Sequence, residues 1–283
     1  MRRWIVFLCA VLAGCGGSLT RRGPLDPALS AFISADAVAL AGVNMDSVRA
    51  TPLYRKLAAQ KRWPRFDEFQ AEDVHEMLVA SNGKNVLAAA RGDFKGKRPS
   101  ELPTLPYKGY TIFIRDERAA VAFLDDHTAV GGPPATVRAA IDQWSRHADA
   151  APRDLVARTE ALPADAQIWA VASGWKGADA GTLRDMGNAA NLDRLLRSVE
   201  GANLTIDLRT GVHAAATGDC RNETDAKTLS ESLRGLAGIA RMGVPKKRPE
   251  LMRVFDGIKV AQEGPVVNVN VDIPEDLAEQ LWK

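Results

Sequence analysis

Hydrophobic and polar residues alternate in short runs along much of the chain, which predicts a protein rich in β-strands. In the clearest run, residues 267–273, Val and Ile alternate with Asn and Asp, so one strand face is packed and the other is polar. Asn82-Gly83 separates apolar runs at residues 77–80 and 85–91 and predicts a tight hairpin. Further strands are expected at residues 38–45, 110–114, 119–124, 128–130, 166–172, 204–208, 212–217 and 257–262.

Hydrophobic residues at helical spacing predict helices between these strands. Thr51 followed by Pro52 is typical of a helix start. Further helices are expected from Pro133, over residues 185–199, from Asn222 with Ala240 still on the buried face, and from Pro274. Strands that pair with their sequence neighbours, mixed with helices, predict an α+β fold in which helices pack on one face of an antiparallel sheet.

The sequence also contains one pattern twice. Residues 86–93 read VLAAARGD, and residues 212–219, which lie 126 positions later, read VHAAATGD. Residues 34–37 (SADA) and 163–166 (PADA) match at an offset of 129 and precede a predicted strand in each case. This period is much longer than that of solenoid repeats. We therefore expect two related subdomains, at residues 30–150 and 158–283.

The N-terminus has the features of a secretion signal. Arg2 and Arg3 precede an apolar run at residues 4–14, which is shorter than the roughly 20 residues that span a bilayer. Residues 12–15 (LAGC) resemble the lipobox of bacterial lipoprotein signal peptides. The resemblance implies cleavage between Gly14 and Cys15 and attachment of acyl chains, palmitate among them, to Cys15. An ordinary signal peptide that contains a cysteine is the alternative.

This resemblance sets the expected location and layout. Residues 1–14 would be the signal peptide, and residues 15–29 would be the lipidated Cys15 with a flexible tether rich in Gly and Pro. Acyl chains on Cys15 would anchor the chain to a membrane of the cell envelope. Because Gly16, and not Asp, follows the cysteine, the expected site is the outer membrane, facing the periplasm.

Composition narrows the classes of partner. With 46% hydrophobic and 25% charged residues, the chain of 283 residues is globular rather than disordered. Arg2 and Arg3 account for the net charge of +2, so the chain from Cys15 on is formally neutral and a nucleic-acid partner is not expected. Of the three cysteines, Cys9 leaves with the signal and Cys15 is acylated. Cys220 then remains as the one thiol, and no intramolecular disulfide is expected.

The histidines do not form a recognisable metal or catalytic motif. His75, His127, His147 and His213 lack a metal-ligand spacing such as HExxH. The densest polar cluster, residues 125–127 (DDH), is interpreted as a solvated turn, with a metal site as the weaker alternative. The two acidic residues Glu72 and Glu76 flank His75 at helical spacing and suggest an acidic helix face. We expect no metal and no cofactor.

Nucleophile motifs are also missing. Ser173 is not part of a GxSxG elbow. Cys220 lies between Asp219 and Arg221 and is interpreted as a buried, unreactive thiol. Trp175 lies in a Gly-containing loop and is a weak candidate for ligand contact. Basic residues at positions 55–65 and 246–248 are interpreted as solvated surface, with contact to anionic lipid as the alternative for the first group.

The folded part resembles uncharacterised bacterial envelope lipoproteins with tandem α+β repeats. The resemblance rests on Ala35-Asp36-Ala37 before a strand and on residues 121–126 (VAFLDD), which lead to Gly131 and a helix. It implies no known activity, so no functional residue is carried over. The leading hypothesis is a membrane-anchored, non-enzymatic module that binds or scaffolds an envelope protein, glycan or lipid. A hydrolase acting on an envelope substrate and a carrier of an apolar ligand are the alternatives.

The anchor hypothesis predicts that Cys15→Ala abolishes labelling with palmitate, and that this variant or treatment with globomycin leaves the signal peptide uncleaved, because Cys15 is the residue that is lipidated and exposed by cleavage. Metabolic labelling with palmitate and the extent of signal cleavage measure these effects. Unchanged labelling and processing in the variant would refute the lipoprotein assignment.

Overall fold

The computed structural model describes residues 23–60, 71–146, 150–174, 197–245 and 250–281. Its strands are β1 (Ala39–Asn44), β2 (Val74–Ser81), β3 (Val86–Gly92), β4 (Thr104–Tyr107), β5 (Tyr110–Ile114), β6 (Ala120–Phe123), β7 (Thr128–Gly132), β8 (Ile168–Ser173), β9 (Val199–Asp207), β10 (Gly211–Cys220), β11 (Ile258–Glu263) and β12 (Val266–Pro274). Its helices are α1 (Pro27–Ser30), α2 (Met45–Arg49), α3 (Pro52–Ala59), the 3-10 turn η1 (Ala71–Asp73), α4 (Pro134–Arg146), α5 (Arg153–Glu160), α8 (Glu223–Met242), α9 (Glu250–Asp256) and α10 (Glu275–Leu281).

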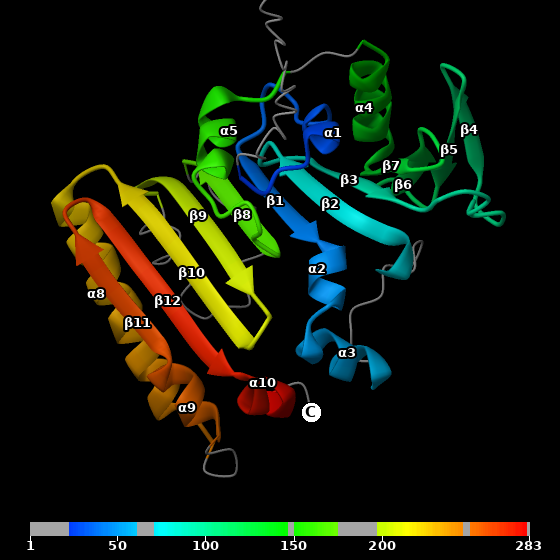
Figure 1. The fold of residues 1–283 in the computed structure, drawn as a ribbon. Helices are drawn as coiled ribbons and strands as arrows, with labels where there is room; N and C mark the ends of the chain where they lie inside the picture. Colours follow the sequence, from blue (N-terminus) through cyan, green and yellow to red (C-terminus); the bar gives the residue numbers. More distant parts are fainter. Residues whose placement is uncertain (1–22, 61–70, 147–149, 175–196, 246–249, 282–283) are drawn as a thin grey trace, which may run out of the picture.

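All twelve strands belong to one antiparallel sheet, in the order β11-β12-β10-β9-β8-β1-β2-β3-β7-β6-β5-β4 (Figure 1). β1 pairs with β8 at its centre, with Gly42 opposite Trp169. The two predicted halves therefore share one sheet. From this central pair the order runs β1-β2-β3 to one side and β8-β9-β10 to the other. The α+β class is confirmed, whereas the internal duplication stays a prediction.

Helices lie over both faces of this sheet, not over one face as the sequence suggested. The first face packs against α1, α4 and α5 through one large core cluster. The second face packs against α2, α3 and α10 in one cluster and against α8 in another. Side chains alternate between the faces along a strand. In β1, for example, Leu40 joins the first core and Val43 the second.

Local signals placed most elements correctly. The Thr51 hydroxyl accepts a hydrogen bond from the Tyr54 amide at 3.2 Å and caps α3, as expected. The Asn82-Gly83 turn joins β2 to β3, with Gly83 at a positive φ of 84° that glycine adopts without strain. One strand, β4, was missed because it contains Pro106, and the short helices α1, α2, α5 and α9 were not predicted either. The strand lies at the sheet edge, where a missing N–H breaks no ladder.

Several boundaries differ from the prediction. β1 ends at Asn44, because the Asn44 side chain accepts from the Ser47 amide and starts α2. Val199 begins β9 and is not the end of a helix, while residues 185–196 lie outside the described part of the chain. Ala240 is exposed. The predicted tether ends too late, because Asp26 and Leu29 are buried at 6% and 2% exposure.

The central pair predicts opposite effects of one substitution at two sites. A Cβ on Gly42 would overlap the Trp169 indole, so Gly42→Ala should destabilise the fold by about 1–3 kcal/mol. Gly235 has open space around it in α8, so Gly235→Ala should stabilise by about 1 kcal/mol. Urea unfolding followed by circular dichroism measures both. Equal effects would mean that Trp169 does not pack against Gly42.

Candidate functional site

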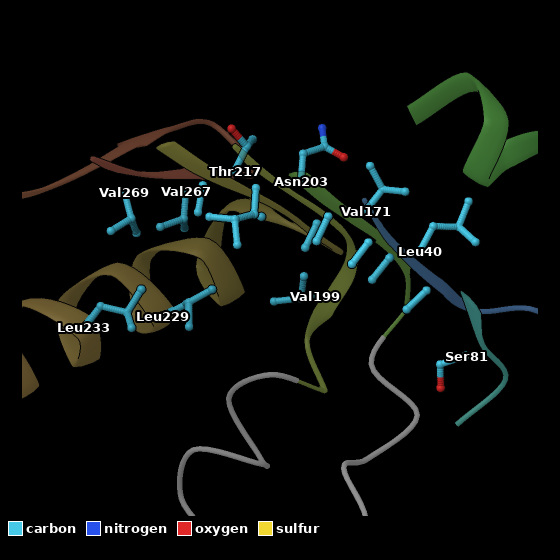
Figure 2. A pocket seen from close by; sticks show the side chains of 18 of the residues that line it. Leu40, Ser81, Val171, Val199, Asn203, Thr217, Leu229, Leu233, Val267 and Val269 are labelled. Carbon is cyan, nitrogen blue, oxygen red and sulfur yellow. The ribbon is translucent and has the colours of Figure 1, made fainter. Parts of the chain in front are cut away.

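The second face of the sheet is hollowed into a trough of about 440 Å³ (Figure 2). Its floor consists of two adjacent rows of residues that run across six neighbouring strands, β2, β1, β8, β9, β10 and β12. The first row is Val79, Ala41, Ala170, Leu204, Ala216 and Val269, and the second is Ser81, Ala39, Ala172, Ala202, Gly218 and Val267. In-register pairing aligns the members of each row.

Small side chains create the trough. In its middle, at β1, β8 and β10, the floor carries only alanine or glycine, and a larger side chain there would fill the space. The opposite face of β1 and β8 carries Leu40 and Val171, which are 1% and 2% exposed in the first core. The same strands thus bear bulky residues on one face and small ones on the other.

The two ends of the trough differ. At the β12 end, Leu229 of α8 packs with Val199 and Val267, all less than 9% exposed, and closes the space. At the β2 end lies Ser81, which is partly exposed. Asn203 and Thr217 also line the trough, but their side chains point away from α8, to the other side of the sheet (Figure 2).

The chemistry of this lining favours an apolar ligand. None of the described residues that line the trough is charged, and Ser81 has the one polar side chain on the trough side. Pockets for small molecules commonly have volumes of about 300–1,000 Å³ and a mainly apolar lining. No sequence motif marks this site. The alanines of β8 and the AAA string of β10 were the available signal, but alanine alone does not reveal which face it occupies.

Several predicted site residues lie outside the described part of the chain. These are Gly14 and Cys15 at the predicted lipidation site, Trp175, His147 and the basic residues at 61–65 and 246–248. Nearby, Lys56 is described, and its ammonium group binds Glu275 and Glu279 of α10, which raises its pKa to about 12. Lys56 therefore connects α3 to α10.

The DDH segment forms a turn between β6 and β7, as interpreted. The Asp125 carboxylate accepts from the His127 amide at 2.7 Å, and His127 Nδ1 lies 3.1 Å from the Gly92 carbonyl oxygen. Asp125 and Asp126 are exposed. None of the three lines the trough. Among the described residues, no group of three His, Cys, Asp or Glu side chains is arranged to hold a metal ion.

His75 is not on an acidic helix face, because η1 ends at Asp73 and His75 lies in β2. Its Nδ1 is 3.0 Å from both Asp46 carboxylate oxygens, and its Nε2 is 3.2 Å from Asp93 Oδ2. Acceptors on both ring nitrogens favour the doubly protonated ring. Hydrogen bonding to Asp46, and then to Asp93, raises the pKa of His75 above its usual 6.5.

His213 belongs to a chain of three polar groups on the first face of the sheet. Its Nε2 lies 2.9 Å from the Thr210 hydroxyl, and its Nδ1 contacts the Asp272 carboxylate. The order hydroxyl–imidazole–carboxylate resembles that of hydrolase triads. However, the His213 and Asp272 side chains are 43% and 63% exposed and lie on the opposite face from the trough. Among the described residues they therefore lie on an open strand surface.

Cys220 is buried at the end of β10, as expected. Burial disfavours its thiolate and, with Asp225 nearby, raises the pKa of the thiol. A raised pKa lowers the fraction of reactive thiolate. The geometry therefore gives Cys220 a packing role beside Val199 and Ala226.

Comparison with known proteins shows the fold alone. No family model and no curated protein sequence matches the chain. Among the solved structures, crystal form III of TP0453 matches with a TM-score of 0.53 and 11% identity, over 91% of this chain and 98% of that one. Crystal forms I and IV of TP0453 match with TM-scores of 0.49 and 0.48 at 12% and 10% identity, over 91% and 92% of this chain and 97% of each of those chains.

A further finding concerns membrane crossing. No helix in the described ranges is long and apolar enough to cross a membrane.

The His75 pair predicts a pH-dependent stability. Partial burial opposes ionisation of Asp46, but hydrogen bonds from His75 and Arg49 outweigh it and lower its pKa below 3.8. The raised pKa of His75 stabilises the folded state fully below about pH 6.5, and this contribution is lost as the pH rises through the raised value. The lowered pKa of Asp46 stabilises the folded state above about pH 4. His75→Gln should therefore lower the urea midpoint most between about pH 4 and 6.5.

Asp46→Asn in the His75→Gln background is the matched control for this pair. It should cost less than Asp46→Asn in the wild-type chain at pH 5.5, because the partner is already gone. A loss on His75→Gln that is the same at pH 5.5 and pH 9 would contradict the ion-pair interpretation.

Proposed function

We propose that this protein is a lipid-anchored envelope protein that binds an apolar ligand in the trough between β2 and α8. The observation that carries the proposal is the uncharged, alanine-rich hollow on the second face of the sheet, where the opposite faces of β1, β2 and β8 carry large buried side chains. The predicted lipidation of Cys15 supports a location at a membrane surface, where apolar ligands are found. Of the three hypotheses from the sequence, the apolar carrier agrees best with this geometry.

The hydrophobic effect favours binding of an apolar ligand in the trough. A ligand that covers the trough removes its apolar surface from water, which contributes about 25 cal/mol for each Å² buried. Because the floor residues lie on paired strands of the central sheet, the site is largely formed before the ligand enters. Binding therefore needs little ordering of the described residues, and ordering is a major cost of association.

The hydrolase alternative receives less support. A pocket that gathers Asp125, Asp126 or His127 with polar residues of the other half would favour a hydrolase, but these three residues lie in a surface turn. The Thr210–His213–Asp272 chain lies entirely in the second half, on an open strand surface.

Two phenylalanine substitutions on one strand test the proposal. Ala216 faces the trough, and its neighbour Ala215 faces solvent on the other side of β10. Ala216→Phe should weaken binding of the neutral fluorophore N-phenyl-1-naphthylamine by at least about tenfold, because the ring occupies the site. Ala215→Phe should leave the affinity unchanged. Fluorescence titration of the mature chain measures both.

Thermal unfolding of the unliganded variants is the control for folding. The Ala216→Phe ring should enter existing space, so the unfolding temperature should not fall. Absence of fluorophore binding to the wild-type chain, or equal binding by the two variants, would contradict the proposed site.

A further inference from the structure

We propose that the trough holds a single linear acyl chain, laid across the strands with its methyl end under α8 and its polar end at Ser81. The occupant is a long-chain fatty acid. This inference rests on the proposed function and specifies its ligand class and orientation.

The length of the trough suits a membrane acyl chain. Its floor spans six strands, and neighbouring strands are about 4.8 Å apart, so the distance from β2 to β12 is about 24 Å. One leaflet of a bilayer has a hydrocarbon thickness of roughly 15 Å, half of the whole core. An acyl chain of membrane length therefore fits lengthwise, perpendicular to the strands.

The width of the trough favours one chain. The floor is two residues wide on each strand, and same-face neighbours along a strand are about 7 Å apart. Non-bonded carbon atoms approach each other to about 3.5–4.0 Å. One alkyl chain can lie between the two rows in contact with both, whereas two chains side by side, or a broad fused ring system, need a wider floor.

The two ends fix the orientation. Leu229 and Val267 close the α8 end with apolar atoms, so a polar group there would be buried without a partner. At the other end the Gly83 amide donates to Ser81 Oγ at 3.1 Å, which leaves the hydroxyl hydrogen of Ser81 available to donate to a carboxylate. Figure 2 shows Ser81 at the opposite end of the trough from Leu229 and Leu233.

Photo-crosslinking reads the orientation directly. Palmitic acid with a diazirine at its methyl end should label α8 or β12, at residues such as Leu233 and Val269. The same acid with the diazirine beside the carboxylate should label β2 near Ser81. Peptide mass spectrometry of the mature, full-length chain locates the adducts. The reverse pattern, or the same pattern from both probes, would overturn the proposed orientation.

A chain-length series tests the linear geometry. Fatty-acid affinity should rise about fourfold for each added methylene while the chain still lengthens inside the trough, and then level off. A diacyl phospholipid should compete more weakly than a lysophospholipid with the same acyl chain. Equal competition, or no dependence on chain length, would refute the single-chain proposal.

Ser81→Asp tests the polar end. A carboxylate there should weaken palmitic acid binding severalfold through charge repulsion and should leave hexadecanol, its uncharged counterpart, unchanged. An unaltered preference between these two ligands would overturn the placement of the carboxylate at Ser81.

The two proposals fail separately. If N-phenyl-1-naphthylamine binds and is blocked by Ala216→Phe, but fatty acids do not bind, the acyl-chain inference is wrong and the apolar site remains. If neither ligand binds, the proposed function itself is wrong.

Discussion

The backbone pairing of β1 with β8 is the interaction on which the rest of the structure depends. It joins two halves, each of which would otherwise end at an unpaired strand edge. The Trp169 indole lies over Gly42 at this pair and belongs to the first core. Because the ladder is continuous, the floor of the trough can run across strands from both halves, and neither half alone contains all of it.

The trough exists because the two faces of β1 and β8 carry side chains of different size. Leu40, Leu78 and Val171 fill the first face at β1, β2 and β8 and are almost completely buried, so they anchor these three of the six strands that form the floor. Alanine on that second face contributes little packing and has a low preference for strands. At β1, β2 and β8 the first face therefore supplies most of the packing, which leaves the second face free to remain hollow. A binding surface on well-anchored strands is better defined than one built on loops.

The polar residues that stood out in the sequence have other uses. His75 bridges carboxylates at the surface, Asp125 shapes a turn, and Lys56 connects α3 to α10. Each of these side chains is paired with its own neighbours in the structure, so they do not converge on one site. The candidate site carries almost no polar groups, so its sequence signal is composition on one strand face. Residues such as Ala172 and Ala202 become informative only once their orientation and neighbours are known.

The sequence by itself determined the α+β class, most strand positions, half of the described α-helices and the caps of α3 and α8, because these depend on local periodicity and on turn residues such as Thr51 and Gly83. Pro106 prevented the prediction of β4 from the sequence. The predicted tether ends too late in the chain, because Asp26 and Leu29 are buried only by tertiary partners. Only the tertiary structure decided that the halves share one sheet, that helices cover both faces, and that the alanines of β1, β8 and β10 line one trough. Strand order and register arise from contacts between residues far apart in the chain, and a local pattern carries no record of them.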